Sequence, residues 1–345
     1  MILLKEVKDT NKILTTEQIF EVVLDSLYIN FYDKSKYNFT FILEIFSSIA
    51  ETKKYLNSLK KQGKTIGFVP TMGALHRGHT SLLDRAKREN DIAVASIFVN
   101  PLQFNDKKDL EKYPRTFESD TEKLKSVHCD VLFAPSTEEM YPSLESNSDS
   151  PIPPFPDSAK ETEKRRKGEK MIVPLGHLDL IMEGTHRPGH FQGMCVVVKK
   201  LFDIIEPTKA YFGEKDFQQL AIIRHMVKVL NIPVEIIPCP TVREADGLAM
   251  SSRNALLNTD ERKNAAHIYK TLSETKEKLK NTSVADLKVW VKEQINANPF
   301  LELEYFEIVN AETLQPVTNR STPAALRACI AVRAGNVRLI DNISI

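Results

Sequence analysis

Two histidines three residues apart, His76 and His79, are the first residues in the chain whose type and spacing favour chemistry. They lie in the glycine-bearing segment 70–79, directly after an apolar run at 65–69. We expect a helix to begin at about Thr80, so this turn would present free backbone N–H groups and the positive end of a helix dipole. The segment therefore predicts a phosphate-binding turn, although ordinary surface histidines are the alternative interpretation.

Three further polar motifs follow apolar runs of strand length. They are Asn100 to Phe104, Gly213 to Asp216 with Gln218 and Gln219 just beyond, and 240–243 with 250–254. Each motif alone is typical of a polar loop. Ligands in open α/β sheets bind outside the carboxyl ends of the strands, and all four motifs are expected there. Their shared position predicts one binding site.

Alternating strands and helices predict the fold class. Apolar runs indicate strands at 65–69, 92–99, 131–134, 210–212 and 234–237, and amphipathic stretches indicate helices at 81–89, 118–127, 194–205 and 217–230. A further helix should start after Ser48, which forms a capping box with Glu51. The pattern predicts an α/β protein with a Rossmann-like parallel sheet that is covered by helices on both faces.

The chain is long enough for two domains, at about 150 residues per domain. We expect the Rossmann-like domain at 46–242 and a smaller α+β domain at 243–345, with helices at 260–280 and 284–296 and strands at 303–309, 328–332 and 337–340. Residues 1–45 are expected to form an N-terminal extension, and their sequence does not indicate a role. Residues 143–170 are rich in proline, serine and charge, which predicts a mobile surface insertion.

Composition narrows the class of protein. Hydrophobic residues make up 42% and charged residues 27%, which is ordinary globular usage and indicates a folded protein outside the membrane. A net charge of +1 offers no general attraction to nucleic acid. Four scattered cysteines without a C-x-x-C pair and a start without a targeting signal favour the reducing cytoplasm.

The motifs that the sequence lacks are also informative. It contains neither a P-loop signature nor a G-x-G-x-x-G motif after a strand, so a P-loop ATPase or an ordinary dinucleotide enzyme is not indicated. It also has no G-x-S-x-G elbow and no cysteine that pairs with a predicted site histidine. Covalent catalysis by the protein is therefore not expected.

Several spaced motifs together resemble one family. They are PTMGALHRGH (70–79), SIFVNPLQF (96–104), YPRT (113–116), RPGHF (187–191), FGEKDFQQL (212–220), GLAMSSRN (247–254) and VRLIDNI (337–343). In this order they are similar to the pantothenate synthetases, or pantoate–beta-alanine ligases, and the resemblance covers about 66–345. The long loop after Tyr141 resembles the fungal form. The family shares its H-x-G-H signature with nucleotidyltransferases.

The resemblance implies an ATP-dependent ligase that forms a pantoyl adenylate and releases pyrophosphate, and then lets beta-alanine displace AMP to give pantothenate. It implies that pantoate contacts Gln103 and Gln219, that Gln103 also faces beta-alanine, and that the enzyme is a homodimer. It assigns His79 as proton donor. The implied ATP site comprises Met72, Gly73, Ala74, Leu75, His76, Arg77, Gly78, His79, Gly213, Glu214, Lys215, Asp216, Val242, Met250, Ser251, Ser252 and Arg253.

The chemistry agrees with these residue types. A pantoate carboxylate is already ionised, so its attack on the α-phosphorus needs no general base, but it does need donors and cations around the pyrophosphate. His76, His79, Lys215 and Arg253 are the candidate catalytic residues. Mg²⁺ should bridge phosphate oxygens and keep much of its water shell, with Asp120 as a candidate helper. The small domain should close over the adenylate and exclude water.

Other assignments remain open. Asn100 is a further candidate for substrate binding, and Arg187 with His190 either approaches the substrates or anchors the preceding insertion. His177, Asp179, Glu183 and His186 are expected in loops and not at a metal.

Two alternative functions belong to other classes. One is a nucleotidyltransferase that acts on a phosphorylated acceptor. The other is a nucleotide-binding module without chemistry. The two neutral glutamines favour a small hydroxylated substrate.

Overall fold

A computed structural model of the 345-residue chain describes residues 42–105, 107–142, 172–319 and 325–345. The chain divides into two compact units, Met1–Ile42 and Leu43–Ile345, and the second unit carries every element described below. The predicted insertion at 143–170 and nearly all of the predicted N-terminal extension lie outside the described residues. Within the described ranges, no helix has both the length and the hydrophobicity needed to span a membrane.

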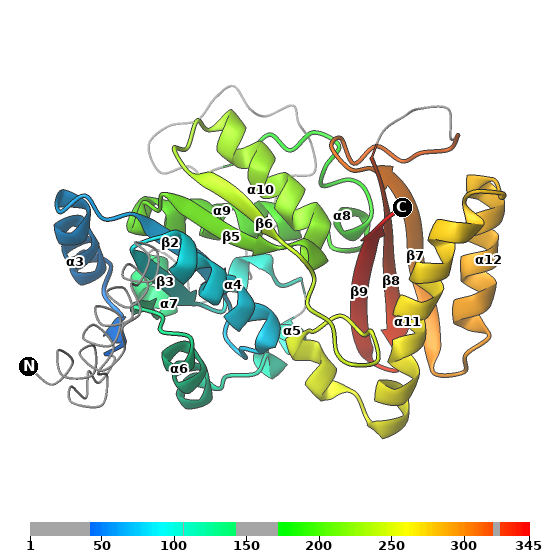
Figure 1. Ribbon diagram of the computed structural model, residues 1–345, viewed down its shortest axis with the longest axis horizontal. Helices are drawn as coiled ribbons and strands as arrows, with labels where there is room; N and C mark the ends of the chain where they lie inside the picture. The colour runs from blue at the N-terminus through cyan, green and yellow to red at the C-terminus, as the bar shows by residue number, and fades with distance from the viewer. Residues whose placement is uncertain (1–41, 106, 143–171, 320–324) are drawn as a thin grey trace, which may run out of the picture. The chain divides into compact units, whose positions relative to one another are not determined.

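A six-stranded parallel sheet is the centre of the larger of the two α/β parts of the second unit (Figure 1). Its order is β1-β4-β3-β2-β5-β6, and all neighbouring strands are parallel. The strands are β1 (Glu44–Phe46), β2 (Ile66–Thr71), β3 (Ile92–Ile97), β4 (Val131–Phe133), β5 (Lys209–Gly213) and β6 (Glu235–Cys239). The predicted Rossmann-like parallel sheet is confirmed. The edge strand β1 was not predicted, and it begins inside the segment that we had placed in the N-terminal extension.

Helices cover both faces of this sheet (Figure 1). Helices α4 (Arg77–Glu89) and α6 (Phe117–Ser126) lie on one face, and α3 (Ile49–Lys61), α9 (His190–Ile205) and α10 (Phe217–Val229) lie on the other. Short helices α5 (Lys107–Lys112), α7 (Thr137–Met140) and α8 (Glu183–His186) and the 3-10 turns η2 (Pro101–Gln103), η4 (Glu214–Asp216) and η5 (Ser252–Leu256) connect the longer elements. Of the predicted capping box of α3, the structure has one half, in which the Ser48 hydroxyl accepts the Glu51 N–H.

The core between sheet and helices explains the apolar runs in the sequence. Phe68 of β2 is fully buried and meets Phe202 of α9 edge to face, with ring centroids 6.4 Å apart. Leu56 of α3 and Phe133 of β4 belong to the same buried cluster. Strands that are covered on both faces carry continuous apolar sequence, which is why length and spacing were enough to predict them.

The C-terminal part has a sheet and a core of its own. Strands β7 (Leu301–Asn310), β8 (Leu326–Ala334) and β9 (Val337–Ser344) are antiparallel, in the order β7-β8-β9. Helices α11 (Thr259–Lys278) and α12 (Val284–Asn296) pack on this sheet around a separate hydrophobic cluster. The predicted smaller α+β region is therefore present. Each of its strands is longer than the apolar run from which we predicted it.

Gly193 of α9 allows the closest approach between α9 and η2. A Cβ atom at this position would lie 2.0 Å from the carbonyl oxygen of Leu102, and the Gly193 carbonyl accepts a hydrogen bond from Asn100. We expect Gly193→Ala to destabilise the protein by about 2 kcal/mol or more, because backbone atoms must move apart. Thermal unfolding measures the effect.

Gly213→Ala is the matched control. Its Cβ would meet nothing within 4 Å, and Gly213 has an ordinary φ of −72°. A melting temperature for Gly193→Ala equal to that of this control would contradict the close packing of α9 on η2.

Candidate active site

The histidine pair begins helix α4. The helix starts at Arg77, three residues earlier than the predicted Thr80, so His76 is its N-cap and His79 is its third residue. Nδ1 of His76 accepts the Gly78 N–H at 3.1 Å, and Nδ1 of His79 accepts the His76 N–H at 3.3 Å. The two side chains thus cap the helix in the way that serine and glutamate do in a capping box.

These contacts assign the protons on both rings. Because each Nδ1 accepts a backbone N–H, the proton of each neutral imidazole lies on Nε2. Burial lowers the pKa of His76 to about 4 and that of His79 to about 3; nearby Lys215 lowers the first further, and nearby His76 the second. Both rings, whose centroids are 4.1 Å apart, are therefore neutral hydrogen-bond donors at pH 7.

Asp120 holds the turn that precedes the histidines. Its carboxylate is buried and accepts the backbone N–H groups of Ala74 and Leu75, both at 2.8 Å, and the hydroxyl of Thr116 at 3.1 Å. The turn includes two residues at positive φ, Gly73 (81°) and Ala74 (49°). The bonds show a structural role for Asp120 in this turn, and the expectation that it helps a metal stays a prediction.

Two cavities adjoin at the carboxyl end of the parallel sheet. The first, of about 220 Å³, lies beside the histidine turn, and the second, of about 330 Å³, lies between this edge and the small sheet. Five residues line both cavities: Lys215, Asp216, Gln219, Ser251 and Arg253. The shared lining indicates one continuous site with two compartments.

Most of the predicted site residues line the first cavity. They are Met72, His76, Gly78, His79, Gln103, Gly213, Lys215, Asp216, Gln219, Val242, Met250, Ser251, Ser252 and Arg253. Arg187 lines the second cavity. Neither lining includes Gly73, Ala74, Leu75, Arg77, Glu214 or Asn100. Arg77 is exposed on α4, and Ala74 and Leu75 turn their N–H groups to Asp120.

Asn100 lies behind the cavity and orients Gln103. It is fully buried, and its Nδ2 donates to Oε1 of Gln103 at 3.2 Å and to the carbonyl of Gly193 at 3.1 Å. Its Oδ1 accepts the Tyr141 hydroxyl at 2.9 Å. Since Asn100 donates to Oε1 of Gln103, the Gln103 Nε2 group is directed to the opposite side, toward Met72 at 3.1 Å.

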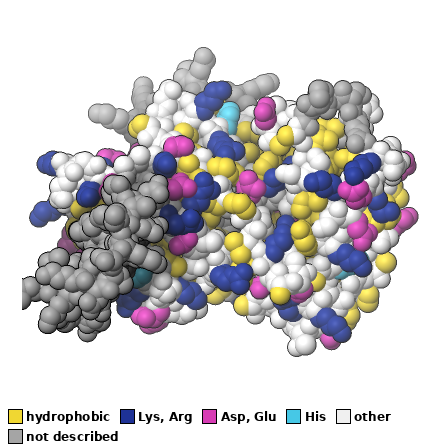
Figure 2. Space-filling model, viewed as in Figure 1, with side chains coloured by type: hydrophobic (Ala, Val, Ile, Leu, Met, Phe, Trp, Pro, Cys, Tyr) yellow, Lys and Arg dark blue, Asp and Glu magenta, His cyan; other side chains and the backbone are white. Residues whose placement is uncertain are grey.

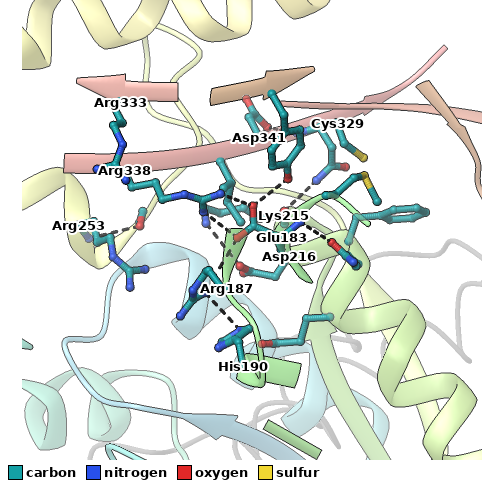
Figure 3. A pocket seen from close by; sticks show the side chains of 18 of the residues that line it. Glu183, Arg187, His190, Lys215, Asp216, Arg253, Cys329, Arg333, Arg338 and Asp341 are labelled. Carbon is teal, nitrogen blue, oxygen red and sulfur yellow. Dashed lines mark hydrogen bonds and ion pairs between the residues drawn. The ribbon is translucent and has the colours of Figure 1, made fainter. Parts of the chain in front are cut away.

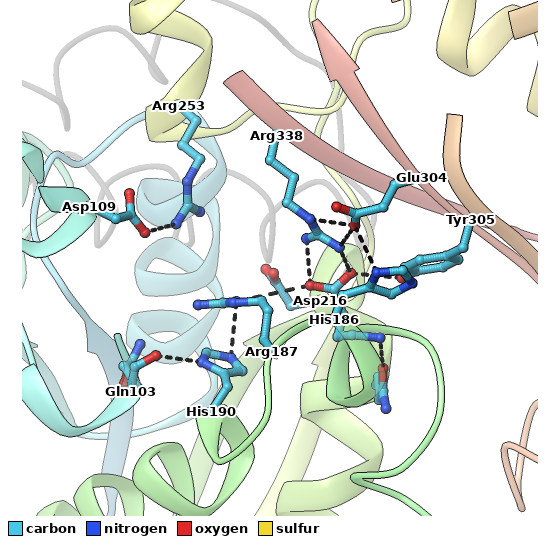
Figure 4. A network of polar contacts seen from close by, with 12 residues as sticks. Gln103, Asp109, His186, Arg187, His190, Asp216, Arg253, Glu304, Tyr305 and Arg338 are labelled. Carbon is cyan, nitrogen blue, oxygen red and sulfur yellow. Dashed lines mark hydrogen bonds and ion pairs between the residues drawn. The ribbon is translucent and has the colours of Figure 1, made fainter. Parts of the chain in front are cut away.

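The segment 240–254 brings cations and hydroxyls to the same edge. The Met250 N–H donates to the Val242 carbonyl at 3.0 Å, which joins the two halves of the segment. Ser251 accepts the Arg253 N–H at 3.3 Å and so begins η5. The Arg253 guanidinium lies 3.5 Å from the Asp109 carboxylate at the mouth of the site (Figure 4).

His190 and Arg187 form the floor of the second cavity (Figures 3 and 4). Nε2 of His190 lies 3.2 Å from Nη1 of Arg187, which can only donate, so His190 carries its proton on Nδ1 and donates to the Gln103 carbonyl at 2.8 Å. Burial, with Arg187 nearby, lowers the pKa of His190 to about 4. The motif RPGHF (187–191) therefore lines the site, and its His190 is hydrogen-bonded to Gln103, the candidate for pantoate binding.

Glu183 and Arg338 are site residues that the sequence did not reveal. Two hydrogen bonds of 2.7 Å join the Arg338 guanidinium to the Glu183 carboxylate (Figure 3). This carboxylate also accepts the Tyr305 hydroxyl at 2.8 Å. These partners pull the pKa of Glu183 down, against its burial, and keep it ionised. We had placed Glu183 in a loop; its partner is 155 residues away, and only the motif VRLIDNI marked the position of Arg338.

Basic and acidic side chains line the middle of the site together. The cations are Arg187, Lys215, Arg253, Arg333 and Arg338, and the carboxylates are Asp109, Glu183, Asp216 and Asp341. Arg187 lies 3.9 Å from Glu183, and nearby Arg253 and Arg338 add to the burial that lowers the pKa of Arg187. On the face shown in Figure 2, basic and acidic side chains are interspersed over the described surface. Among the described residues, no three His, Cys, Asp or Glu side chains converge as a metal site. The cations among these groups could bind the phosphates of a nucleotide.

The comparisons with known proteins decide the family. The sequence model of the pantoate-beta-alanine ligase family matches residues 44–344. The chain belongs to the pantoate–beta-alanine ligase family. A pantothenate synthetase of Porphyromonas gingivalis is 48% identical over 87% of this chain and 99% of its own length, and one of Bacteroides fragilis is 47% identical over 87% and 98%.

Solved structures of the ligase family share the fold. A pantothenate synthetase of Thermus thermophilus superposes with a TM-score of 0.74 at 42% identity and covers 87% of this chain and 99% of its own. A pantoate-beta-alanine ligase of Francisella tularensis, complexed with beta-gamma ATP and beta-alanine, gives 0.66 at 37% identity, with coverage of 88% and 98%. These four relatives are bacterial, so the resemblance to a fungal form finds no support in them.

The three site histidines make stability depend on pH. Their pKa values are lowered in the folded protein, to about 4 for His76 and His190 and about 3 for His79, whereas an unfolded chain binds protons near the usual pKa of about 6.5. The unfolded state therefore binds more protons in this range, and we expect stability to fall as the pH falls from about 6.5 toward 4. Thermal unfolding from pH 8 to 4 measures this loss.

His79→Asn should make the loss with pH shallower, because it removes one of the three groups. His225→Asn, outside both cavities, is the control. The assignment of neutral site histidines fails if His79→Asn and His225→Asn show the same pH dependence as the unaltered protein.

Proposed function

We propose how this ligase joins pantoate to beta-alanine in two steps, with ATP activating the pantoate carboxyl. The observation that carries the proposal is the pair of neutral histidines, whose Nδ1 atoms accept the backbone contacts and which line the same cavity as Lys215 and Arg253. Donors and cations around one cavity stabilise charge that develops on a leaving pyrophosphate.

In the first step a pantoate carboxylate oxygen attacks the α-phosphorus of ATP. The bond from this phosphorus to the bridging oxygen breaks, and pyrophosphate leaves with the electron pair. His76 and His79 donate to phosphate oxygens as uncharged groups, while Lys215 and Arg253 supply the positive charge. Protein groups that are already in place need little reorganisation during the reaction, which is the main source of acceleration in such transfers.

Gln103 and Gln219 hold the pantoate. Gln103 is 8% exposed, and Asn100 and His190 fix its side chain and its carbonyl respectively. Gln219 lies in the first turn of α10 and lines both cavities. Two neutral amides can bind hydroxyl groups and a carboxylate without adding charge, as expected for a small hydroxylated acid.

In the second step the beta-alanine amine attacks the acyl carbon, the bond from this carbon to the phosphate oxygen breaks, and AMP leaves. The amine must be uncharged to attack, and the proton that it loses on forming the amide passes to solvent. We place the beta-alanine carboxylate at Arg187, because this guanidinium lies in the second cavity beside Gln103 and near a further cation, Arg253. The small sheet on the other side of this cavity would exclude water from the adenylate.

Mg²⁺, a homodimer and a cytoplasmic location complete the proposal. Mg²⁺ would neutralise phosphate charge and enter mainly with the nucleotide, and Asp109 and Asp216 are the lining carboxylates that could accept hydrogen bonds from its water ligands. Buried free thiols at all four cysteines support a reducing compartment. Sedimentation of the purified chain tests the dimer.

Exchange of labelled pyrophosphate into ATP tests the order of the steps. We expect exchange that requires pantoate and Mg²⁺ but not beta-alanine, because adenylation precedes the attack of the amine. AMP release should require all components. The measurement is the initial rate of label incorporation with each component omitted in turn.

Other functions give different exchange results. A nucleotidyltransferase would show exchange that depends on a phosphorylated acceptor, and a nucleotide-binding module would show none. Exchange without pantoate would also contradict the two-step ligase.

Two substitutions at His79 separate its two nitrogens. Asparagine places a polar group near the Nδ1 position and can keep the contact to the His76 N–H, but it lacks the Nε2 donor. Glutamine places an amide N–H near the Nε2 position. We expect His79→Asn to lower turnover about 10²- to 10³-fold, as for other preorganised donors, and His79→Gln to recover part of the loss.

The measurement is the rate of pantothenate formation at saturating substrates, with melting temperatures as the check on folding. Equal rates for the two variants would argue against donation from Nε2.

A further inference from the structure

The last strand of the small sheet contacts the turn that carries Lys215. We propose that Asn342 of β9 is a positioning residue, which sets the backbone of η4 so that Lys215 faces the phosphates. The proposal rests on the role given to Lys215 above. It assigns the small sheet a part in building the nucleotide site, in addition to covering it.

The side-chain amide of Asn342 makes two hydrogen bonds to η4. Its Nδ2 donates to the carbonyl of Glu214 at 2.9 Å and to that of Lys215 at 2.8 Å. Asn342 is 3% exposed, so these bonds are formed away from water. η4 leads directly into α10, so these two bonds join β9 to the start of that helix.

Arg327 fixes the orientation of this amide. Nε of Arg327 donates to Oδ1 of Asn342 at 2.6 Å, and Nη2 donates to the Glu214 carboxylate at 3.0 Å. An arginine can only donate, so the amide atom that faces it must be the oxygen and the NH₂ group must face η4. The Arg327 guanidinium also lies 4.4 Å from the ring centroid of Phe217, the first residue of α10.

The neighbouring residue on β9 holds the other nucleotide segment. Asp341 accepts two hydrogen bonds from Arg243, at 2.6 and 3.0 Å, and Arg243 lies next to Val242 in the segment that leads to Met250 and Ser251. Figure 3 shows Asp341 on the strand of the small sheet, in the lining of the cavity that Lys215 also lines. Two consecutive residues of β9 therefore hold both loops that carry phosphate ligands.

The consequence concerns the direction of the Lys215 side chain. Lys215 lines both cavities, and its Nζ lies 3.7 Å from the Asp216 carboxylate. A flexible four-carbon side chain reaches a fixed point only when its backbone is fixed, and without Asn342 the η4 backbone would lose two buried hydrogen bonds. Loss of the amide should therefore weaken the contact of Lys215 with phosphate while leaving the fold intact.

Binding of an ATP analogue tests this without any turnover. Asn342→Leu removes the amide at similar volume, and Asn342→Asp keeps the acceptor for Arg327 but loses the two donors. We expect each to weaken binding of the β,γ-methylene analogue of ATP, with Mg²⁺, by about 10-fold in titration calorimetry. Asn298→Leu is the control, since it removes an amide of the same region that bonds Asn264 and the Phe300 N–H.

A double-mutant cycle separates positioning from general stability. If Asn342 acts through Lys215, then Asn342→Leu in a Lys215→Met background should weaken analogue binding by less than about 2-fold further. A structural role alone would give the same loss in both backgrounds. Melting temperatures of the single and double variants show whether each protein is folded.

Three results would overturn the proposal. They are analogue binding by both Asn342 variants equal to that of the Asn298→Leu control, an equal loss in the two Lys215 backgrounds, and a folded Lys215→Met protein that binds the analogue normally. Failure of the ligase mechanism would show differently, as normal analogue binding without pantoate-dependent exchange.

Discussion

Parallel pairing of the central strands is the constraint on which the site depends. In β2 and β3 the register pairs Pro70 with Ser96, and in β5 and β6 it pairs Gly213 with Cys239. Each strand therefore ends at the same edge, and the chain segment after it leaves there. Four segments that are far apart in sequence meet at this edge only because every neighbouring strand runs in the same direction. An antiparallel partner in the middle would send one motif to the opposite edge.

The same constraint explains what the sequence could reveal. Buried parallel strands must be apolar and helices between them must be amphipathic, so elements and their order were predictable. The polar motifs could be placed at one edge because they directly follow strands. His76 and His79 are separated by one turn of helix, and local spacing was enough to bring them together. The predicted start of α4, Thr80, lies three residues beyond its actual start at Arg77, because a histidine is an uncommon N-cap.

Side-chain contacts between segments far apart in the sequence could not be predicted from local patterns. Nothing local to Glu183 indicates that a guanidinium 155 residues later will pair with it. The bonds that Asp120 makes to backbone N–H groups could not be predicted either, because any sequence supplies such groups. Asn100 was expected to touch substrate, and it instead holds Gln103 from behind. The strand β1 has three residues, too few for a period to be recognised.

Gln103 and Gln219 hold the same proposed substrate but differ in how firmly the protein holds them. Gln103 is attached at its side chain by Asn100 and at its carbonyl by His190, and each of these residues has further partners in Tyr141 and Arg187. Any replacement there disturbs several neighbours at once. Gln219 is more exposed and lies on a regular helix. Natural or laboratory variation in acid specificity should therefore accumulate first on α10, while the side of the pocket formed by Gln103 stays unchanged.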